Sequence, residues 1–236
     1  MKSVRSVASD LGVLEREAGM AMATIASLVD DELGKPTRCE GWTRAHVVAH
    51  LVRDAEALTH LATWAVTGEE TPAYASAEER AADIERTAAE LSARQLAAAL
   101  DRADRQLAEA LARLRSGVAV ETVPTPFAGE IDVFALPALR TTELIVHHHD
   151  LDTTWQWHEA GTDAIVDAID ICVLRLRANP DSPGLHVVAR EGEEWTVGDG
   201  ATRIEGYYEE LLPFLAREEV ESGLRHDGDL PALPRW

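Results

Sequence analysis

The chain has 236 residues, enough for one large domain or for a main domain with a smaller partner. Its 42 acidic and 22 basic residues give a formal net charge of −20. This charge repels phosphate backbones and anionic membrane surfaces, so we expect no binding to nucleic acid and none to membranes.

Cysteine content and hydropathy favour a cytoplasmic protein. Cys39 and Cys172 are the two cysteines, too few for a disulfide framework or a four-thiolate zinc site. The sequence has no apolar run of 18 residues, and its first residues lack the apolar core of a signal peptide.

The first part of the chain predicts helices. Apolar residues recur three or four apart over residues 3–30, which indicates one helical stripe. A second helix is expected to begin after Thr43 as its N-cap and to end near Gly68. The stripe consists of Val4, Val7, Leu11, Leu14, Ala18, Met22, Ile25 and Leu28.

Residues 77–115 are rich in Ala, Glu, Arg and Leu and also predict helix. Ser76 and Glu79 have the spacing of a capping box at its start. A break near Ser92 divides this stretch into two helices or bends one.

In the remainder of the chain the sequence pattern changes from helix alone to a mixture of helices and strands. Residues 117–134 predict a loop with a short strand, because glycines and prolines surround the β-prone run VAVETV. Alternating segments separated by glycine turns then predict strands. The expected elements are helices over 135–157, 162–178 and 206–219, and strands within LHVVAREG, EWTVGDG and ATRIEG.

These elements predict an α+β fold with two domains. Residues 1–160 are expected to form a metal-binding four-helix bundle, and residues 161–236 a smaller α+β domain.

Histidines in two of the predicted helices suggest a metal pocket. His46 and His50 are four residues apart, as are Glu143 and His147, so each pair projects from one helix face. Two such faces meeting across a bundle core form the usual pattern of bundle metal sites. His50, Glu143 and His147 are the proposed ligands, a set that suits zinc and leaves a coordination position open.

Plainer interpretations of the neighbouring residues remain open. His46 can be a buried, hydrogen-bonded histidine beside the core. His148 and His149 can face solvent or support the metal ligands. For Asp150 and Asp152 the simplest role is a solvated or capping residue, and the alternative is a hydrogen-bond partner of a ligand histidine.

Several segments resemble one family. The stretch EGWTRAHVVAHLVRDAEALTHLATWAVTGEETPAYAS is similar to the N-terminal motif of the mycothiol-dependent maleylpyruvate isomerases, which belong to the DinB-like four-helix metalloproteins. The segment TELIVHHHDL resembles their second metal motif, and LPALPRW their C-terminal ending. The preceding α+β stretch resembles their sterol-carrier-like domain. The run TGEETPAY is closer to the isomerases themselves than to the wider superfamily.

The resemblance implies a site and its cofactors. The family's zinc ligands correspond to His50, Glu143 and His147, and its cofactors are zinc (or another divalent metal) and mycothiol. Arginines that hold substrate and thiol correspond to Arg80 and Arg217, with Arg86 and Arg225 close enough in sequence to be alternatives.

The implied reaction converts maleylpyruvate to fumarylpyruvate in gentisate degradation, through addition of a mycothiol thiolate, bond rotation and elimination. Neither cysteine of the chain is well suited to be this nucleophile, because Cys39 lies in a loop and Cys172 in an apolar run. Two other functions stay open: a different mycothiol-dependent zinc S-transferase, which would share the metal ligands but not the arginines, and a non-enzymatic DinB-like binding module.

Overall fold

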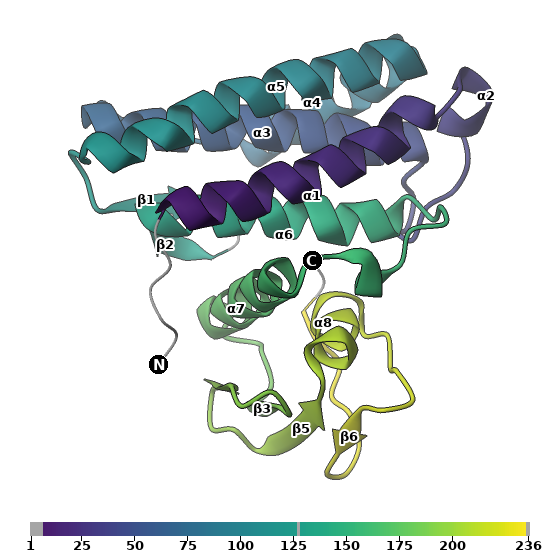
Figure 1. Ribbon diagram of the computed structural model, residues 1–236, viewed down its shortest axis with the longest axis vertical. Helices are drawn as coiled ribbons and strands as arrows, with labels where there is room; N and C mark the ends of the chain where they lie inside the picture. The colour runs from purple at the N-terminus through teal and green to yellow at the C-terminus, as the bar shows by residue number, and fades with distance from the viewer. Residues whose placement is uncertain (1–6, 127, 235–236) are drawn as a thin grey trace.

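A long helical bundle lies above a smaller α+β unit in the computed structural model of the chain, which describes residues 7–126 and 128–234 (Figure 1). This is the α+β architecture that the sequence predicts. Among the described helices, none has both the length and the apolar character needed to span a bilayer. The bundle is formed by α1 (Val7–Ser27), α3 (Arg44–Thr67), α5 (Ala93–Arg113) and α6 (Leu136–Asp150).

Shorter elements surround the bundle. The short α2 (Asp30–Leu33) links α1 to α3, and α4 (Ala77–Glu90) packs along α3. Two further connections are single 3₁₀ turns, η1 (Leu114–Ser116) and η2 (Val133–Ala135). Between these turns, β1 (Thr122–Thr125) and β2 (Gly129–Asp132) pair as an antiparallel hairpin.

The predicted helix boundaries around α3, α4 and α5 are confirmed. Thr43 precedes α3 in extended backbone, and Gly68 ends it in the left-handed conformation (φ 76°) that glycine adopts without steric cost. Ser76 caps α4 by accepting from the Glu79 backbone N–H. Ser92 separates α4 from α5, so residues 77–115 form two helices.

The structure corrects three of the predicted elements. The predicted helix 3–30 is α1 followed by a break, because Val29 is extended before α2 begins; Val4 lies outside the described residues. The expected single strand is the β1–β2 hairpin. The helix predicted over 135–157 ends at Asp150, because Asp152 has a φ of 51° and Arg44 donates to the carbonyls of Leu151 and Asp152.

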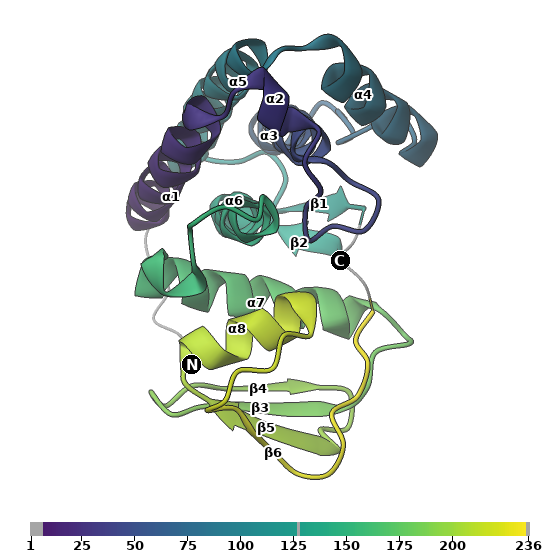
Figure 2. The same ribbon diagram turned by 90° about the vertical axis from the view of Figure 1, so that its right-hand side faces the viewer.

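The C-terminal unit (residues 157–234) contains a mixed sheet covered by two helices. Its strand order is β4-β3-β5-β6, with β3 and β5 parallel and both outer pairs antiparallel. Both helices lie between the sheet and α6 (Figure 2). The elements are η3 (Trp157–Glu159), α7 (Thr162–Ala178), β3 (Leu185–Ala189), β4 (Glu194–Val197), β5 (Thr202–Gly206), α8 (Tyr208–Arg217) and β6 (Arg225–His226).

Helix α6 contributes to both hydrophobic cores. Leu144 packs into the core of the bundle, whereas Ile145 and Val146 pack into the core of the C-terminal unit. Because α6 is covered on both sides, even its polar side chains are buried. The predicted domain division after residue 160 stays a prediction.

A buried arginine joins three bundle helices. Arg140 of α6 is fully buried and donates to Asp54 of α3 (2.7 Å) and to Asp104 of α5 (2.7 Å). Hydrogen bonds and opposite charges offset the cost of burying these groups, so removing one partner leaves the others uncompensated.

We expect the Arg140→Leu variant to lose about 3–5 kcal/mol of stability, because buried Asp54 loses its partner. The control is Arg105→Leu, which breaks an exposed pair with Asp101 and should cost at most about 1 kcal/mol. Urea unfolding of both variants measures the difference. Equal losses would show that the Arg140 network does not stabilise the bundle.

Candidate metal and substrate site

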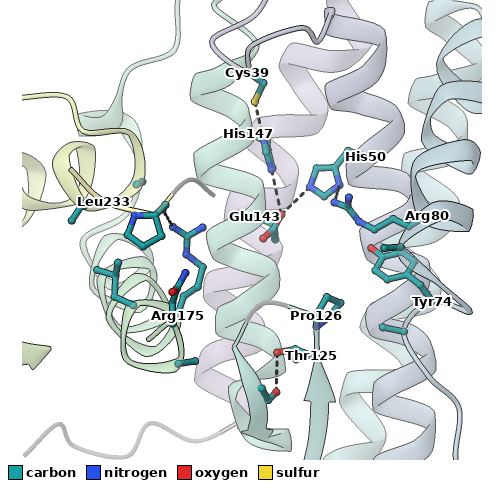
Figure 3. Close-up of a pocket in the computed structure, with 18 of the residues that line it drawn as sticks. Cys39, His50, Tyr74, Arg80, Thr125, Pro126, Glu143, His147, Arg175 and Leu233 are labelled. Atoms are coloured by element: carbon teal, nitrogen blue, oxygen red, sulfur yellow. Dashed lines mark hydrogen bonds and ion pairs between the residues drawn. The ribbon is translucent and has the colours of Figure 1, made fainter. Parts of the chain in front are cut away.

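The three predicted metal ligands meet at the interface of α3 and α6. His50 Nε2 lies 2.9 Å from Glu143 Oε2, and His147 Nε2 lies 3.3 Å from the same oxygen (Figure 3). One ligand atom from each side chain lies within 4.8 Å of the others, and all three residues are buried. We call these residues the His50–Glu143–His147 cluster.

Burial and hydrogen bonds shift the pKa values of all three residues of the cluster. Burial lowers the pKa of His50 to about 4, so its imidazole is neutral at pH 7. Burial alone would raise the pKa of Glu143, but hydrogen bonds from His147 and His50 hold it well below its usual range. Burial alone would lower the pKa of His147, but its hydrogen bonds, above all with Asp150, raise it well above its usual range. The cluster therefore holds an ionised carboxylate between a neutral His50 and a protonated His147.

The donor set fits a divalent cation. Nitrogen and oxygen ligands of tetrahedral zinc lie about 3.3 Å from one another. The separations of 2.9 and 3.3 Å in the cluster are close to this value. A second group of Cys39, His147 and Asp150 also has ligand atoms within 4.8 Å, but Arg217 already binds both oxygens of Asp150.

Asp150 contacts the cluster through His147, on the ring nitrogen that faces away from Glu143. Its Oδ2 lies 2.8 Å from His147 Nδ1, and its carboxylate also accepts from Arg217 Nε (2.7 Å) and Cys39 Sγ (3.2 Å). This partner keeps the proton on Nδ1 and leaves Nε2 facing Glu143. Of the two interpretations of Asp150, the solvated or capping residue is wrong, because the carboxylate is fully buried. The alternative, a hydrogen-bond partner of His147, is the one that the structure shows, and its further partner Arg217 comes from α8.

The other histidines of α6 do not face the cluster. His148 bonds to Thr24 Oγ1 (2.7 Å) and stacks on Trp155, and His149 bonds to Glu219 (3.0 Å). Both histidines are buried, which excludes solvent exposure, one of the two interpretations left open for them. The hydrogen bond of His148 connects α6 to α1, and that of His149 connects α6 to the C-terminal unit.

His46 also lies apart from the cluster. It is half-buried, and its Nδ1 lies 2.8 Å from Thr43 Oγ1 at the start of α3. The expected hydrogen bond of His46 is present, but the expected full burial is not. Asp152 is exposed and pairs with Arg38 (3.0 Å).

A cavity of about 1360 Å³ opens above the cluster and is lined by both the bundle and the C-terminal unit. Arg80 and Arg217, both predicted from the sequence, line it. The two alternatives lie elsewhere: Arg86 pairs with Asp83 on an exposed face of α4, and Arg225 is exposed in β6. The structure therefore favours Arg80 and Arg217 over Arg86 and Arg225 as residues of the cavity.

Two arginines at the site have different surroundings. Arg80 Nη2 lies 3.2 Å from His50 Nδ1, and its guanidinium lies 5.5 Å from the centre of the Tyr74 ring. Arg217 donates through its fork to Asp150. Burial alone would lower the pKa of Arg217, but Asp150 raises it.

Residues 14–152 match the family of the mycothiol maleylpyruvate isomerase N-terminal domain, and they make up more than half of the chain. The chain belongs to this family. Two solved structures, the crystal structures of the mycothiol-dependent maleylpyruvate isomerase and of its histidine-to-alanine mutant, have the same fold. Each has a TM-score of 0.84, at 22% and 21% identity, with 100% of both chains covered. No curated protein matches the chain.

The match to the isomerase N-terminal domain family spans the whole His50–Glu143–His147 cluster. It ends before Arg175 and Arg217, which the C-terminal unit brings to the cavity. Arg175 lies on α7 and was missed in the sequence. Its spacing of three residues from buried Cys172 places it on the core-facing side of that helix, which could have identified it.

We expect Asp150→Asn to weaken zinc binding by about 10- to 100-fold, because His147 loses the carboxylate that orients its ring. Asp152→Asn is the matched control, since Asp152 is exposed and does not contact the cluster. Competition with a chromophoric chelator measures both affinities. Unchanged zinc affinity in Asp150→Asn would contradict the supporting role of Asp150.

Proposed function

We propose that the protein is a mycothiol-dependent maleylpyruvate isomerase of the gentisate pathway. The observation that carries the proposal is the His50–Glu143–His147 cluster beneath a cavity that also holds Arg80. Membership of the isomerase N-terminal domain family supports it and implies mycothiol as the cofactor.

The proposed reaction needs a nucleophile that adds to the substrate and is later released from it unchanged. When bound, mycothiol would supply a thiolate that can add to one carbon of the cis double bond, with the electron pair passing into the adjacent ketone as an enolate. The former double bond is now single and rotates. The enolate then re-forms the double bond in the trans geometry and expels the thiolate, so no net oxidation or reduction occurs.

His50, Glu143 and His147 would hold the divalent metal, for which zinc is the first candidate. When bound, the metal would act as a Lewis acid and favour the thiolate form of mycothiol over the thiol at neutral pH. The protein's task is to keep the three ligands in place, and Asp150 does this for His147 through the 2.8 Å contact.

The chain's own cysteines are less suited to be the nucleophile. Burial raises the pKa of Cys172 to about 12, so this thiol stays protonated at neutral pH. Cys39 donates its S–H to Asp150. These surroundings favour an external thiol.

Arg80 is proposed to bind the substrate or its enolate. Guanidinium groups only donate hydrogen bonds, so the contact with His50 Nδ1 requires a lone pair on that nitrogen. If a metal occupies Nε2, Nδ1 carries the proton and Arg80 is released toward the cavity. There it can bind a carboxylate through paired hydrogen bonds.

Arg217 has two proposed roles. Its predicted contact with substrate remains a proposal, supported by its position in the cavity wall. In addition, its fork holds Asp150 and thereby orients His147.

Purified protein should convert maleylpyruvate to fumarylpyruvate, followed by ultraviolet absorbance, only when mycothiol is present. Arg80→Gln and Arg217→Gln should each lower kcat/KM by about 10- to 100-fold, because each removes a charge-assisted hydrogen bond. The control Arg113→Gln alters an exposed arginine at the end of α5 and should leave kcat/KM unchanged.

Equal effects of all three substitutions would exclude Arg80 and Arg217 from the site. Consumption of mycothiol by other electrophiles, without fumarylpyruvate formation, would instead indicate an S-transferase. A protein that binds no divalent metal and shows no turnover would indicate a binding module.

A further inference from the structure

A tyrosine and an arginine that lie close together in the sequence form part of the cavity wall. Tyr74 is the last residue of the run TGEETPAY, in the loop between α3 and α4, and Arg80 lies near the start of α4. Both residues line the cavity. Ser76 connects them, because its side chain accepts from the backbone N–H of Glu79 and its carbonyl accepts from that of Arg80. The helix cap therefore defines the position of Arg80 relative to Tyr74.

The guanidinium of Arg80 is held by two uncharged groups. Its Nη2 lies 3.2 Å from His50 Nδ1, and its Cζ lies over the Tyr74 ring, 5.5 Å from the ring centre. The buried Nε has no hydrogen-bond partner among the described residues. A single contact at one terminal nitrogen leaves the guanidinium plane free to rotate, whereas an aromatic face attracts the cation and restricts its rotamers. The ring is thus the contact that orients Arg80.

An arginine–tyrosine pair elsewhere in the chain shows how the surroundings of Arg80 differ. Arg190 lies over the Tyr207 ring at 4.9 Å, but this tyrosine is exposed. Arg190 also lies 3.7 Å from the carboxylates of Glu205 and Glu210. Carboxylates therefore help to hold Arg190 at the surface, whereas the polar and ring contacts that the structure describes for the Arg80 guanidinium are to an imidazole and a phenol.

The Tyr74 side chain adds no negative charge to the cavity. Figure 3 shows the Tyr74 ring beside Arg80, with its hydroxyl toward the His50–Glu143–His147 cluster. Burial raises the pKa of this hydroxyl, so the phenol is protonated at neutral pH. A carboxylate in the same place would compete with a ligand for the N–H groups of Arg80, but an aromatic face leaves them available.

We propose that Tyr74 is a positioning residue, whose ring holds the Arg80 guanidinium in the orientation in which it binds a ligand carboxylate. The inference rests on the proposed function, in which Arg80 binds the substrate or its enolate. An arginine that is already oriented loses less rotational freedom when the ligand binds, so the ring increases affinity without touching the ligand. A flexible aliphatic residue at position 74 cannot do this.

Calorimetric titration of the metal-loaded protein with maleate, in the absence of mycothiol, tests this proposal. Maleate carries two carboxylates on a cis double bond. Tyr74→Leu removes the ring and should weaken maleate binding by about 3- to 30-fold. Tyr74→Phe keeps the ring and should stay within about 2-fold of the wild type. It tests the proposal even if Tyr74→Leu does not fold, because weak binding by Tyr74→Phe would show that the hydroxyl is required instead.

A double variant distinguishes positioning from a general structural role. In protein that already carries Arg80→Gln, Tyr74→Leu should cause no further loss of maleate affinity, because no guanidinium remains to be oriented. The matched control is Tyr207→Leu, which removes the ring beside Arg190 outside the cavity and should leave maleate affinity unchanged. Each variant should retain its metal, which shows that the cluster is intact.

An equal loss from Tyr74→Leu with and without Arg80 would overturn the proposal, and so would maleate binding that does not depend on Arg80. The outcome is separable from that of the proposed function. If the isomerase assay fails while the effects of Tyr74→Leu and Arg80→Gln are coupled, the positioning role stands. If turnover occurs and Tyr74→Leu leaves maleate affinity unchanged, the isomerase stands and this inference is wrong.

Discussion

The structure depends on one buried carboxylate that joins two helices. Glu143 of α6 lies between His50 of α3 and His147 one turn further along α6. Ionised carboxylates are costly to bury, and hydrogen bonds from both imidazoles offset this cost. The same arrangement brings three atoms that could bind a metal ion within 4.8 Å of one another. The stability of the helix interface and the chemistry of the site therefore depend on the same contacts.

The C-terminal unit contributes further contacts to the cluster. Arg217 of α8 binds Asp150, and Asp150 binds His147. A residue of the smaller unit therefore helps to orient His147 in the bundle. The cavity likewise needs both units, because Arg80 comes from the bundle and Arg175 from α7. We infer that the bundle alone would keep the cluster but lose the part of the cavity wall that the C-terminal unit contributes.

The sequence predicts the cluster well because its information is local. The spacing of four residues places Glu143 and His147 on one helix face and His46 and His50 on another, and the family resemblance agrees with the choice of His50. Burial of Asp150 could not be predicted in this way, because it depends on Arg217, 67 residues away. The same holds for the end of α6, where the side chain of Arg44 binds carbonyls 107 and 108 residues further along the chain. Long-range contacts of this kind leave no periodic pattern.

The most direct test is the divalent-metal content of protein purified without a histidine tag. The account predicts one metal per chain in the wild type, and loss of that metal in His50→Ala and Glu143→Ala. His46→Ala should keep it, because His46 lies on the same helix but outside the cluster. A metal-free wild type, or metal retained in both cluster variants, would contradict the account.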